Sequence, residues 1–333
     1  MSIPAISVAM SVFNGERFLA PAIESILGQT FDDFEFLILD DGSSDGTPAI
    51  VRDYAARDPR IRPILRENRG LVASLNQLLV EARAPLVARM DADDISRPDR
   101  FARQIAFFAG HPDYGVVGSR SEDIDEFDAP YVVTGPEHPE THEGFLAAIE
   151  NGWPLLCHPA VMYRRDLVLS VGGYHAAFRH CEDLDLWLRL ASVTRLCSLP
   201  ERLIRYRHYA GQVSSRHATE QLVGAAVARL AYDARQAGRP DPTADLAALP
   251  PLDQLDDLFG PGAAAEVRTR VAPGLLYSRA GLGDHGFDLL VDYLREGGDR
   301  NGMWRTVARL VSFGEPVRAA RLAATLALTT VAA

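Results

Sequence analysis

The stretch Val87-Ala88-Arg89-Met90-Asp91-Ala92-Asp93-Asp94-Ile95 joins a short apolar run to a cluster of carboxylates. The apolar run predicts a buried strand that ends at the cluster. Like charges this close repel one another, so the cluster is unfavourable unless a cation relieves it. Oxygen ligands at this spacing suit Mg²⁺ or Mn²⁺, which usually bind through one or two carboxylates plus substrate phosphates. An acidic loop that caps the following helix is the alternative interpretation.

Strands and helices are expected to alternate ahead of this stretch. The sequence predicts strands at 5–12, 34–39 and 61–65 and helices at 17–27, 48–56 and 71–82. Such alternation is typical of an α/β fold with a doubly wound, mostly parallel sheet flanked by helices. The carboxyl ends of parallel strands lie along one edge of the sheet, where ligands usually bind. We therefore expect the Asp40-Asp41 turn and the Asp91-Asp94 cluster to form one site.

The second half of the chain changes character near residue 218. Helices are expected at 100–109 and 145–149 and from Glu182 onward, strands at 114–118, 159–163, 197–199 and 203–206, and an acidic, turn-rich segment at 123–136. From about residue 218, alanine-rich helical segments and a Pro/Ala/Asp-rich connector at 238–252 follow. We therefore predict a sheet domain at 1–217 and a smaller helical region at 218–333.

The composition is that of a soluble globular protein. The chain has 333 residues, 47% of them hydrophobic and 24% charged. A net charge of −11 argues against nucleic acid as a partner, because phosphate binding needs basic patches. Three cysteines without C-x-x-C spacing favour a reducing compartment over a disulfide framework. The sequence shows no signal peptide and no run of 18 apolar residues, so a cytoplasmic location is expected.

Five motifs stand in the order found in family 2 glycosyltransferases, and over about residues 4–216 the chain resembles that family. They are Ser7-Val8-Ala9-Met10-Ser11-Val12-Phe13-Asn14-Gly15, Ser25-Ile26-Leu27-Gly28-Gln29-Thr30-Phe31, Asp40-Asp41-Gly42-Ser43-Ser44-Asp45-Gly46-Thr47, Asp91-Ala92-Asp93-Asp94 and Glu182-Asp183. The resemblance implies a GT-A type, Rossmann-like fold, with a nucleotide-binding half at about 1–97 and an acceptor half at about 98–217. It also implies inverting transfer from a nucleotide diphosphate sugar, with UDP favoured, to a saccharide or lipid-linked acceptor in polysaccharide or glycoconjugate biosynthesis.

The resemblance assigns roles to the acidic residues. Asp93 is expected to bind Mn²⁺ or Mg²⁺, Asp91 to hold the ribose side of the nucleotide, and Asp94 either to assist the metal or to cap the next helix. Asp183 is expected to be the catalytic base, next to Glu182. A helix N-terminus would favour the ionised form of Asp183, and acids that merely complement the helix dipole are the alternative interpretation.

Further residues are expected to contact the nucleotide. Asp41 resembles the family's base-reading carboxylate, and Ser11-Val12-Phe13-Asn14 resembles its base-contacting segment. Asn68 and Arg69 precede a helix near the nucleotide. The alternatives are a turn-forming role for Asp41, core positions for Val12 and Phe13, and a solvent-facing Arg69.

Two histidines and a tryptophan complete the predicted site. His158 and Trp187 are placed near the acceptor, although Trp187 also suits the core. His208 matches the position from which some members of the family supply a third metal ligand or a diphosphate contact. A surface histidine is the ordinary alternative for each of the two histidines.

Departures from the family pattern narrow the prediction. No Gln-x-x-Arg-Trp motif follows Glu182-Asp183, which favours a non-processive enzyme. A sugar-1-phosphate nucleotidyltransferase is the closest enzymatic rival, but Asn14-Gly15-Glu16-Arg17 lacks its glycine-rich basic loop. A non-catalytic nucleotide-sugar-binding protein is the other alternative, and the presence of every expected carboxylate counts against it.

The C-terminal helices could contact a membrane or a second copy of the chain. Residues 304–311 and 317–322 combine apolar and arginine positions in the way that interfacial helices can. They are candidates for peripheral contact with the inner face of the membrane or for a homodimer. A solvated face of a helical domain is the favoured interpretation.

Overall fold

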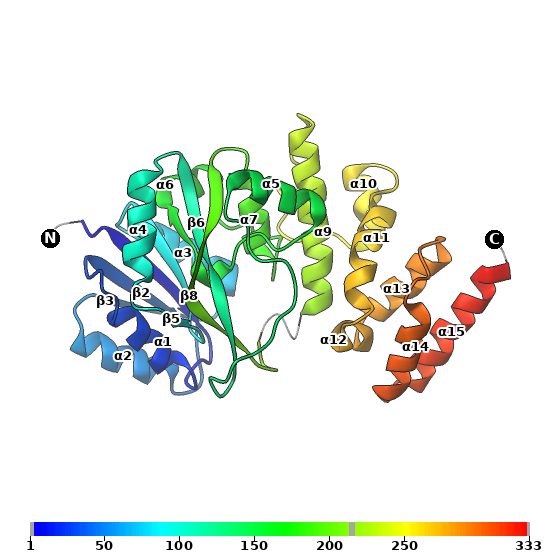
Figure 1. Ribbon diagram of the computed structural model, residues 1–333, viewed down its shortest axis with the longest axis horizontal. Coiled ribbons are helices and arrows are strands. Elements are labelled where there is room, and N and C mark those ends of the chain that lie inside the picture. Colours follow the sequence, from blue (N-terminus) through cyan, green and yellow to red (C-terminus); the bar gives the residue numbers. More distant parts are fainter. Residues whose placement is uncertain (1–2, 213–216, 332–333) are drawn as a thin grey trace. The chain divides into compact units, whose positions relative to one another are not determined.

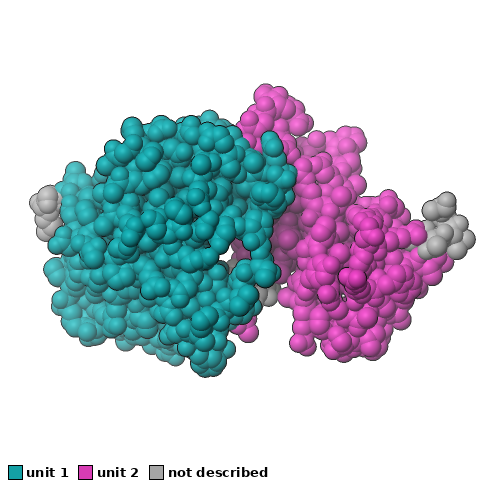
Figure 2. Space-filling view, in the orientation of Figure 1, with its two compact units in different colours: residues 1–175, 182–209 teal, residues 176–181, 210–333 magenta. Residues whose placement is uncertain are grey.

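The computed structural model describes residues 3–212 and 217–331 and divides the chain into two compact units (Figures 1 and 2). Unit 1 comprises Met1–His175 and Glu182–Tyr209, and unit 2 comprises Ala176–Cys181 and Ala210–Ala333. The boundary expected near residue 218 coincides with the start of helix α9, whereas the units separate after Tyr209. The short segment Ala176–Cys181 was not expected to belong with the C-terminal region.

Unit 1 alternates strands and helices in its first half. Its elements are β1 (Ile6–Val12), α1 (Leu19–Leu27), β2 (Phe34–Asp40), α2 (Thr47–Arg57), β3 (Ile61–Leu65), α3 (Leu71–Glu81), β4 (Leu86–Asp91), β5 (Ile95–Ser96), α4 (Arg100–Gly110), β6 (Tyr114–Asp125), α5 (His142–Asn151), the 3-10 helix η1 (His158–Ala160), β7 (Met162–Arg164), α6 (Arg165–Ser170), α7 (Glu182–Leu190) and β8 (Arg195–His208).

These strands form one eight-stranded sheet in the order β3-β2-β1-β4-β7-β6-β8-β5. Strands β1 to β4 pair in parallel, β6 pairs in parallel with β8, and β7 and β5 run antiparallel to their neighbours. The predicted mostly parallel α/β sheet is therefore confirmed. The register sets Val12 beside Asp40 and Ser11 beside Asp91, so the two acidic strand ends share one edge, as predicted.

Helices cover both faces of the sheet (Figure 1). Alternate residues of β1, including Ile6, Val8 and Met10, share one buried cluster with residues of α1, α2 and α4. Successive side chains of a strand point to opposite faces, so Ala9 points the other way. Helix α3 packs against β1 and β2 outside that cluster. The site edge therefore rests on a core packed from both sides.

Two predicted elements differ from the structure. The strand predicted at 159–163 begins as the 3-10 helix η1 and becomes a strand only at Met162, consistent with the fixed φ and missing N–H of Pro159. The two short strands predicted at 197–199 and 203–206 are one strand, β8. It pairs with β6, which extends beyond the predicted strand at 114–118, and the pairing contains register shifts. This pairing brings Asp123 and Asp125 beside Tyr206 and His208.

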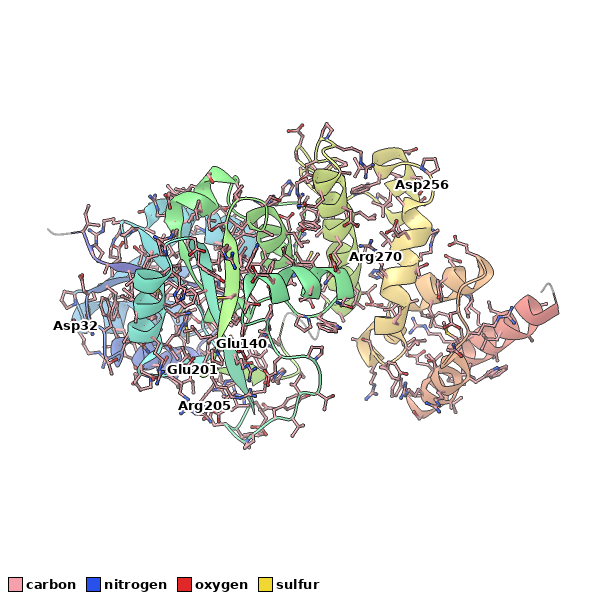
Figure 3. The ribbon with its side chains drawn as sticks, turned by 45° about the horizontal axis from the view of Figure 1, so that its top comes forward. Asp32, Glu140, Glu201, Arg205, Asp256 and Arg270 are labelled. Carbon is pink, nitrogen blue, oxygen red and sulfur yellow. The ribbon has the colours of Figure 1, made fainter. Side chains whose placement is uncertain are left out.

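Unit 2 is helical, as predicted. It contains α9 (Ala218–Gln236), the 3-10 helix η2 (Leu252–Gln254), α10 (Leu255–Phe259), α11 (Ala263–Leu275), α12 (Arg279–Gly283), α13 (Gly286–Arg295), α14 (Met303–Ser312) and α15 (Pro316–Val331). Phe287, Leu310 and Leu322 belong to its own buried core. Asp256 fixes the start of α11 by accepting hydrogen bonds from the N–H groups of Gly262 (3.2 Å) and Ala264 (2.8 Å) (Figure 3). Among the helices described, none is long and apolar enough to span a bilayer.

Candidate active site

Asp91, Asp93 and Asp94 form a tight carboxylate group at the end of β4. One oxygen of each lies within 4.8 Å of one oxygen of the other two. Arg89 relieves part of the repulsion: it is 1% exposed and donates to Asp91 Oδ1 over 2.5 Å. The backbone N–H of Arg207 also donates to Asp94 Oδ1 over 2.9 Å. The strand that carries the acids thus also carries their counter-charge.

This counter-charge leaves part of the repulsion unrelieved. Burial, together with the charge of Asp91, raises the pKa of Asp93 to about 6. Burial and the charges of Asp93 and Asp91 hold the pKa of Asp94 well above its usual range. Asp94 Oδ2 is buried and has no hydrogen-bond partner within the part of the chain that the structure describes. A divalent cation would satisfy this oxygen and relieve the repulsion, so the donor set fits Mn²⁺ or Mg²⁺.

The strand end of β8 presents Tyr209, and not His208, to this group. The Tyr209 hydroxyl donates to Asp93 Oδ2 over 3.0 Å. His208 Nε2 lies 2.7 Å from Asp123 Oδ1, and its ring stacks on Tyr131 with centroids 4.3 Å apart. Successive residues of an extended chain point in opposite directions, which separates the two side chains. The structure does not bring His208 into the carboxylate group, and its role as a metal ligand stays a prediction.

The Asp41 carboxylate fixes the turn ahead of α3. It is 2% exposed and accepts hydrogen bonds from the N–H groups of Arg69 (3.0 Å) and Gly70 (2.8 Å). The Arg66 guanidinium lies 2.8 Å from Asp41 Oδ1. The side chains of Asn68 and Arg69 are exposed beside it. Asp41 therefore stabilises this turn, and its hydrogen bond to the nucleotide base stays a prediction.

The end of β1 holds an exposed aromatic ring at the same edge. Phe13 is 55% exposed, whereas Val12 is 4% exposed and packs in the core. Asn14 adopts a left-handed backbone (φ 51°), and its Oδ1 accepts the N–H of Ser44 over 2.8 Å. This bond ties the turn after β1 to the turn after β2. Phe13 is thereby held as an exposed apolar surface two positions after Ser11, which pairs with Asp91.

Glu182 and Asp183 form the first turn of α7. The helix N-terminus was expected to favour the ionised form of Asp183, and the N–H of Leu184 does donate to Asp183 Oδ1 over 2.7 Å. Burial outweighs this bond and, with the charge of Asp91, raises the pKa of Asp183 to about 6. Burial and the charge of Asp183 raise the pKa of Glu182 to about 8. Glu182 Oε2 is buried without a partner among the described groups. The pair is therefore electrostatically linked to the β4 cluster.

His158 and Trp187 lie next to each other. The His158 ring is 5.9 Å from the Trp187 ring and roughly perpendicular to it, and His158 Nε2 is 3.0 Å from the Tyr174 hydroxyl. Burial and the charge of Arg89 hold the pKa of His158 well below its usual range, so the ring is neutral. Trp187 is 1% exposed, which places it in the core beside His158.

Sequence reasoning gave no role to Arg89, Tyr174 or Tyr209. Arg89 carried a usable signal, because a charged residue inside an apolar strand is almost never buried unless it is paired. Tyr209 stood next to the predicted His208. Tyr174 carried no such signal, because its position depends on how the chain after α6 returns to the sheet.

Comparison with known proteins agrees with the fold. The model of the family described as "Glycosyl transferase family 2" matches residues 7–172. AmsE, an amylovoran biosynthesis glycosyltransferase of Erwinia amylovora, is 31% identical over 215 residues, covering 63% of this chain and 79% of AmsE. EpsE of Bacillus subtilis is 40% identical over 190 residues, which cover 56% of this chain and 66% of EpsE, just under two thirds of its length.

Solved structures share the fold at low sequence identity. S. aureus TarS in complex with UDP-GlcNAc gives a TM-score of 0.59 at 17% identity, covering 89% of this chain and 93% of that one. The mannosyltransferase PcManGT of Pyrobaculum calidifontis, in complex with GDP-Man and Mn²⁺, gives 0.53 at 18% identity, covering 99% and 88%. Together with the matched family model and relatives, these likenesses establish that the chain belongs to glycosyltransferase family 2 and is a glycosyltransferase.

Proposed function

We propose that the protein is an inverting, non-processive glycosyltransferase that uses a UDP-linked sugar. It transfers the sugar to a hydroxyl of a saccharide or lipid-linked acceptor in polysaccharide or glycoconjugate assembly. The observation that carries the proposal is that the charge of Asp91, in the Asp91–Asp94 cluster, acts on Asp183, a half-buried carboxylate whose pKa is raised to about 6. Two acidic groups with separate environments suit two tasks, holding the diphosphate and accepting a proton.

The donor would lie along the carboxyl edge of β1, β2 and β4. The exposed ring of Phe13 offers a stacking surface for the base, next to Ser11 and Asn14. Asp41, Asn68 and Arg69 lie at the neighbouring turn, and Asp91 reaches the edge through its exposed side (31% of the side chain). The complexes of TarS with UDP and UDP-GlcNAc support this class of donor.

Asp93 and Asp94 would hold the divalent cation, with Asp94 Oδ2 as the oxygen that lacks a partner. Bound there, the cation would supply charge to stabilise the leaving diphosphate. The Mn²⁺ in the PcManGT complex supports this assignment. The Tyr209 hydroxyl orients Asp93, and Arg89 orients Asp91, so the protein presents preorganised oxygens. His208 stays a candidate for a further contact.

Asp183 would accept the proton of the acceptor hydroxyl. The acceptor oxygen attacks the anomeric carbon, the bond from that carbon to the diphosphate oxygen breaks, and the proton passes to the Asp183 carboxylate. A pKa near 6 keeps Asp183 ionised at pH 7 yet more basic than an ordinary aspartate. Glu182, with a pKa of about 8, holds its proton at pH 7, so the pair carries one negative charge.

Acceptor recognition would fall to the acceptor half, where His158 and Trp187 lie. The segment after β6 exposes Phe127 (78%), Val132 (84%) and Val133 (56%), an apolar surface suited to a sugar face or a lipid-linked group. In unit 2, Trp304 (61%) and Val317 (80%) are exposed on α14 and α15. These positions keep open the proposed contact with the inner face of the membrane or a homodimer.

The test is metal-dependent nucleotide binding and sugar transfer by the full chain. UDP binding is measured by calorimetry with and without Mn²⁺, and release of UDP is followed from a panel of UDP-linked sugars. We expect Asp93→Ala to weaken UDP binding in Mn²⁺ by about 100-fold, because a charge-bearing metal ligand is lost. Asp53→Ala, an exposed aspartate of α2, is the matched control. An unchanged UDP affinity in Asp93→Ala would refute the metal assignment.

A further inference from the structure

A second group of potential metal ligands lies entirely within unit 2. His217 directly precedes α9, Glu220 lies in its first turn, and His180 comes from the segment Ala176–Cys181. One potential ligand atom of each residue lies within 4.8 Å of the other two. His217 Nδ1 is 2.6 Å from Glu220 Oε2, and the two imidazoles stack with centroids 3.9 Å apart.

Packing holds His180 at this position. Helix α9 has Gly224 at the point where the segment crosses it, and a Cβ there would lie 2.4 Å from Cys181 Sγ. Only glycine allows so close an approach without a shift of the segment. His180 itself has a left-handed backbone (φ 66°), which is uncommon outside glycine. The surrounding structure must therefore stabilise this conformation.

The chemistry of the three side chains matches a transition metal. Imidazole and carboxylate form the two-histidine, one-carboxylate sets that bind Zn²⁺ and its neighbours, with a position left for water. The side chains of His217 and Glu220 are 39% and 50% exposed, so an ion can enter from solvent.

We propose that His180, His217 and Glu220 bind a zinc-class transition metal ion, distinct from the Asp91–Asp94 site. A metal lies in the plane of the imidazole that binds it, so one of the stacked rings must turn about its Cβ–Cγ bond, which is a soft torsion. The ion fastens the segment Ala176–Cys181 to α9 within unit 2. Glu182 follows His180 by two positions in the sequence, so the clamp holds the chain directly ahead of the proposed catalytic pair.

The experiment uses the untagged full chain, stripped of metal, in an Asp93→Asn and Asp94→Asn background that silences the other site. Co²⁺ is titrated and followed by its visible absorption, and Zn²⁺ binding is measured by calorimetry. We expect one equivalent of either ion. His180→Gln, His217→Gln and Glu220→Gln should each weaken binding at least about tenfold. His285→Gln, an exposed histidine of the same unit, should leave it unchanged.

Two results would overturn the proposal. One is the absence of stoichiometric Zn²⁺ and Co²⁺ binding in the silenced background. The other is binding that survives His180→Gln and His217→Gln with unchanged affinity. Melting temperatures of the variants in chelator show whether a variant has lost a metal ligand or has lost its fold. Glu220→Gln is the variant least able to disturb the fold, because the Glu220 side chain is half exposed. Zn²⁺ should raise the melting temperature of the parent but not that of His217→Gln.

Discussion

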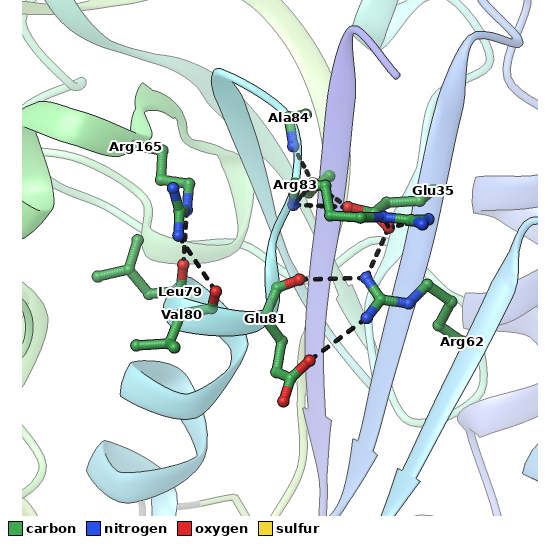
Figure 4. Close-up of polar contacts among 9 residues, drawn as sticks. Glu35, Arg62, Leu79, Val80, Glu81, Arg83, Ala84 and Arg165 are labelled. Atoms are coloured by element: carbon green, nitrogen blue, oxygen red, sulfur yellow. Dashed lines mark hydrogen bonds and ion pairs between the residues drawn. The ribbon is translucent and has the colours of Figure 1, made fainter. Parts of the chain in front are cut away.

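Buried carboxylates lie at both ends of the central strands, and the two ends differ in how fully these carboxylates are hydrogen-bonded. At the amino end, Glu35 of β2 is 3% exposed and accepts the Ser7 hydroxyl (2.6 Å) and the Arg83 N–H (2.8 Å) (Figure 4). Its other oxygen accepts hydrogen bonds from Arg62 Nη1 and Arg83 Nε, each over 2.7 Å. At the carboxyl end, Asp94 and Glu182 each keep one buried oxygen without a partner among the described residues.

The pKa values move in opposite directions at the two ends. Burial raises the pKa of Glu35, but hydrogen bonds from Ser7, Arg83 and Arg62 outweigh burial and lower it overall. Burial and the charge of Asp91 raise the pKa of Asp183 to about 6 because its hydrogen bonds are too few. A satisfied buried carboxylate stabilises a fold, whereas an unsatisfied one marks a place where a ligand is expected. Burial alone does not distinguish the two.

The largest expected effect is the loss of catalysis in Asp183→Asn. The amide cannot accept the hydroxyl proton, so we expect transfer to fall by about 10³-fold. The melting temperature should hold or rise, because the variant removes a charge that burial disfavours. The measurement pairs single-turnover transfer with thermal melting. Loss of stability that accounts for the loss of transfer would assign Asp183 to the structural class, with Glu35.

The next effect concerns the arginines that neutralise the carboxylates at each end of the strands. Arg89→Ala leaves buried acids without their counter-charge, and we expect a loss of about 3–5 kcal/mol in the free energy of unfolding. Arg83→Ala is the matched change at the other end, and because 47% of the Arg83 side chain is exposed, its loss should cost less than about 1 kcal/mol. Urea unfolding of both variants provides the measurement. Equal losses in the free energy of unfolding would contradict the expectation that the buried Arg89 contributes more than the half-exposed Arg83.

Glu35→Gln should act on stability and spare activity. The neutral amide weakens the bonds from Arg62 and Arg83 and leaves one donor poorly paired, so we expect a loss of about 2 kcal/mol in the free energy of unfolding. Transfer per folded molecule should match the parent, since Glu35 lies at the opposite ends of the strands. A fall in transfer measured well below the melting temperature would show that Glu35 is coupled to the carboxylates at the other end of the strands.

The smallest effect is on the pH dependence of stability, to which Glu35 and Asp183 contribute with opposite sign. Glu35 has a lowered pKa, so its stabilisation is present above its ordinary value of 4.5 and is lost as the pH falls. Asp183 has a pKa raised from 3.8 to about 6, so its ionisation destabilises the fold progressively between these two pH values and fully above about 6. Asp183→Asn should therefore gain stability over the parent above pH 6 and lose that advantage in acid.

The same pKa predicts the pH dependence of catalysis. Transfer should fall by about tenfold for each pH unit below about 6, because the proton must leave Asp183 before it can accept another. The kcat/KM profile of the parent is the measurement. A profile that stays flat down to pH 5 would remove Asp183 as the base.

Much of the carboxyl edge could be predicted from the sequence. The alternation of strands and helices implied a parallel sheet, and a parallel sheet places Asp40 and Asp91 at one edge, as the register shows. The acidic start of α7 at Glu182 was also visible as a local pattern. These features depend on periodicity and on neighbours in the chain, which the sequence carries directly.

The rest was decided by tertiary structure. Whether Tyr209 or His208 meets Asp93 depends on which way each residue points at the end of β8, and that follows from a pairing with β6 that contains register shifts. Whether a buried carboxylate is satisfied depends on donors from distant parts of the chain, such as Ser7 and Arg83 for Glu35. The meeting of His180 with His217 likewise depends on a segment that packs away from its sequence neighbours. The sequence by itself determined where the acids stand, and only the packing decided which of them are left to bind a ligand.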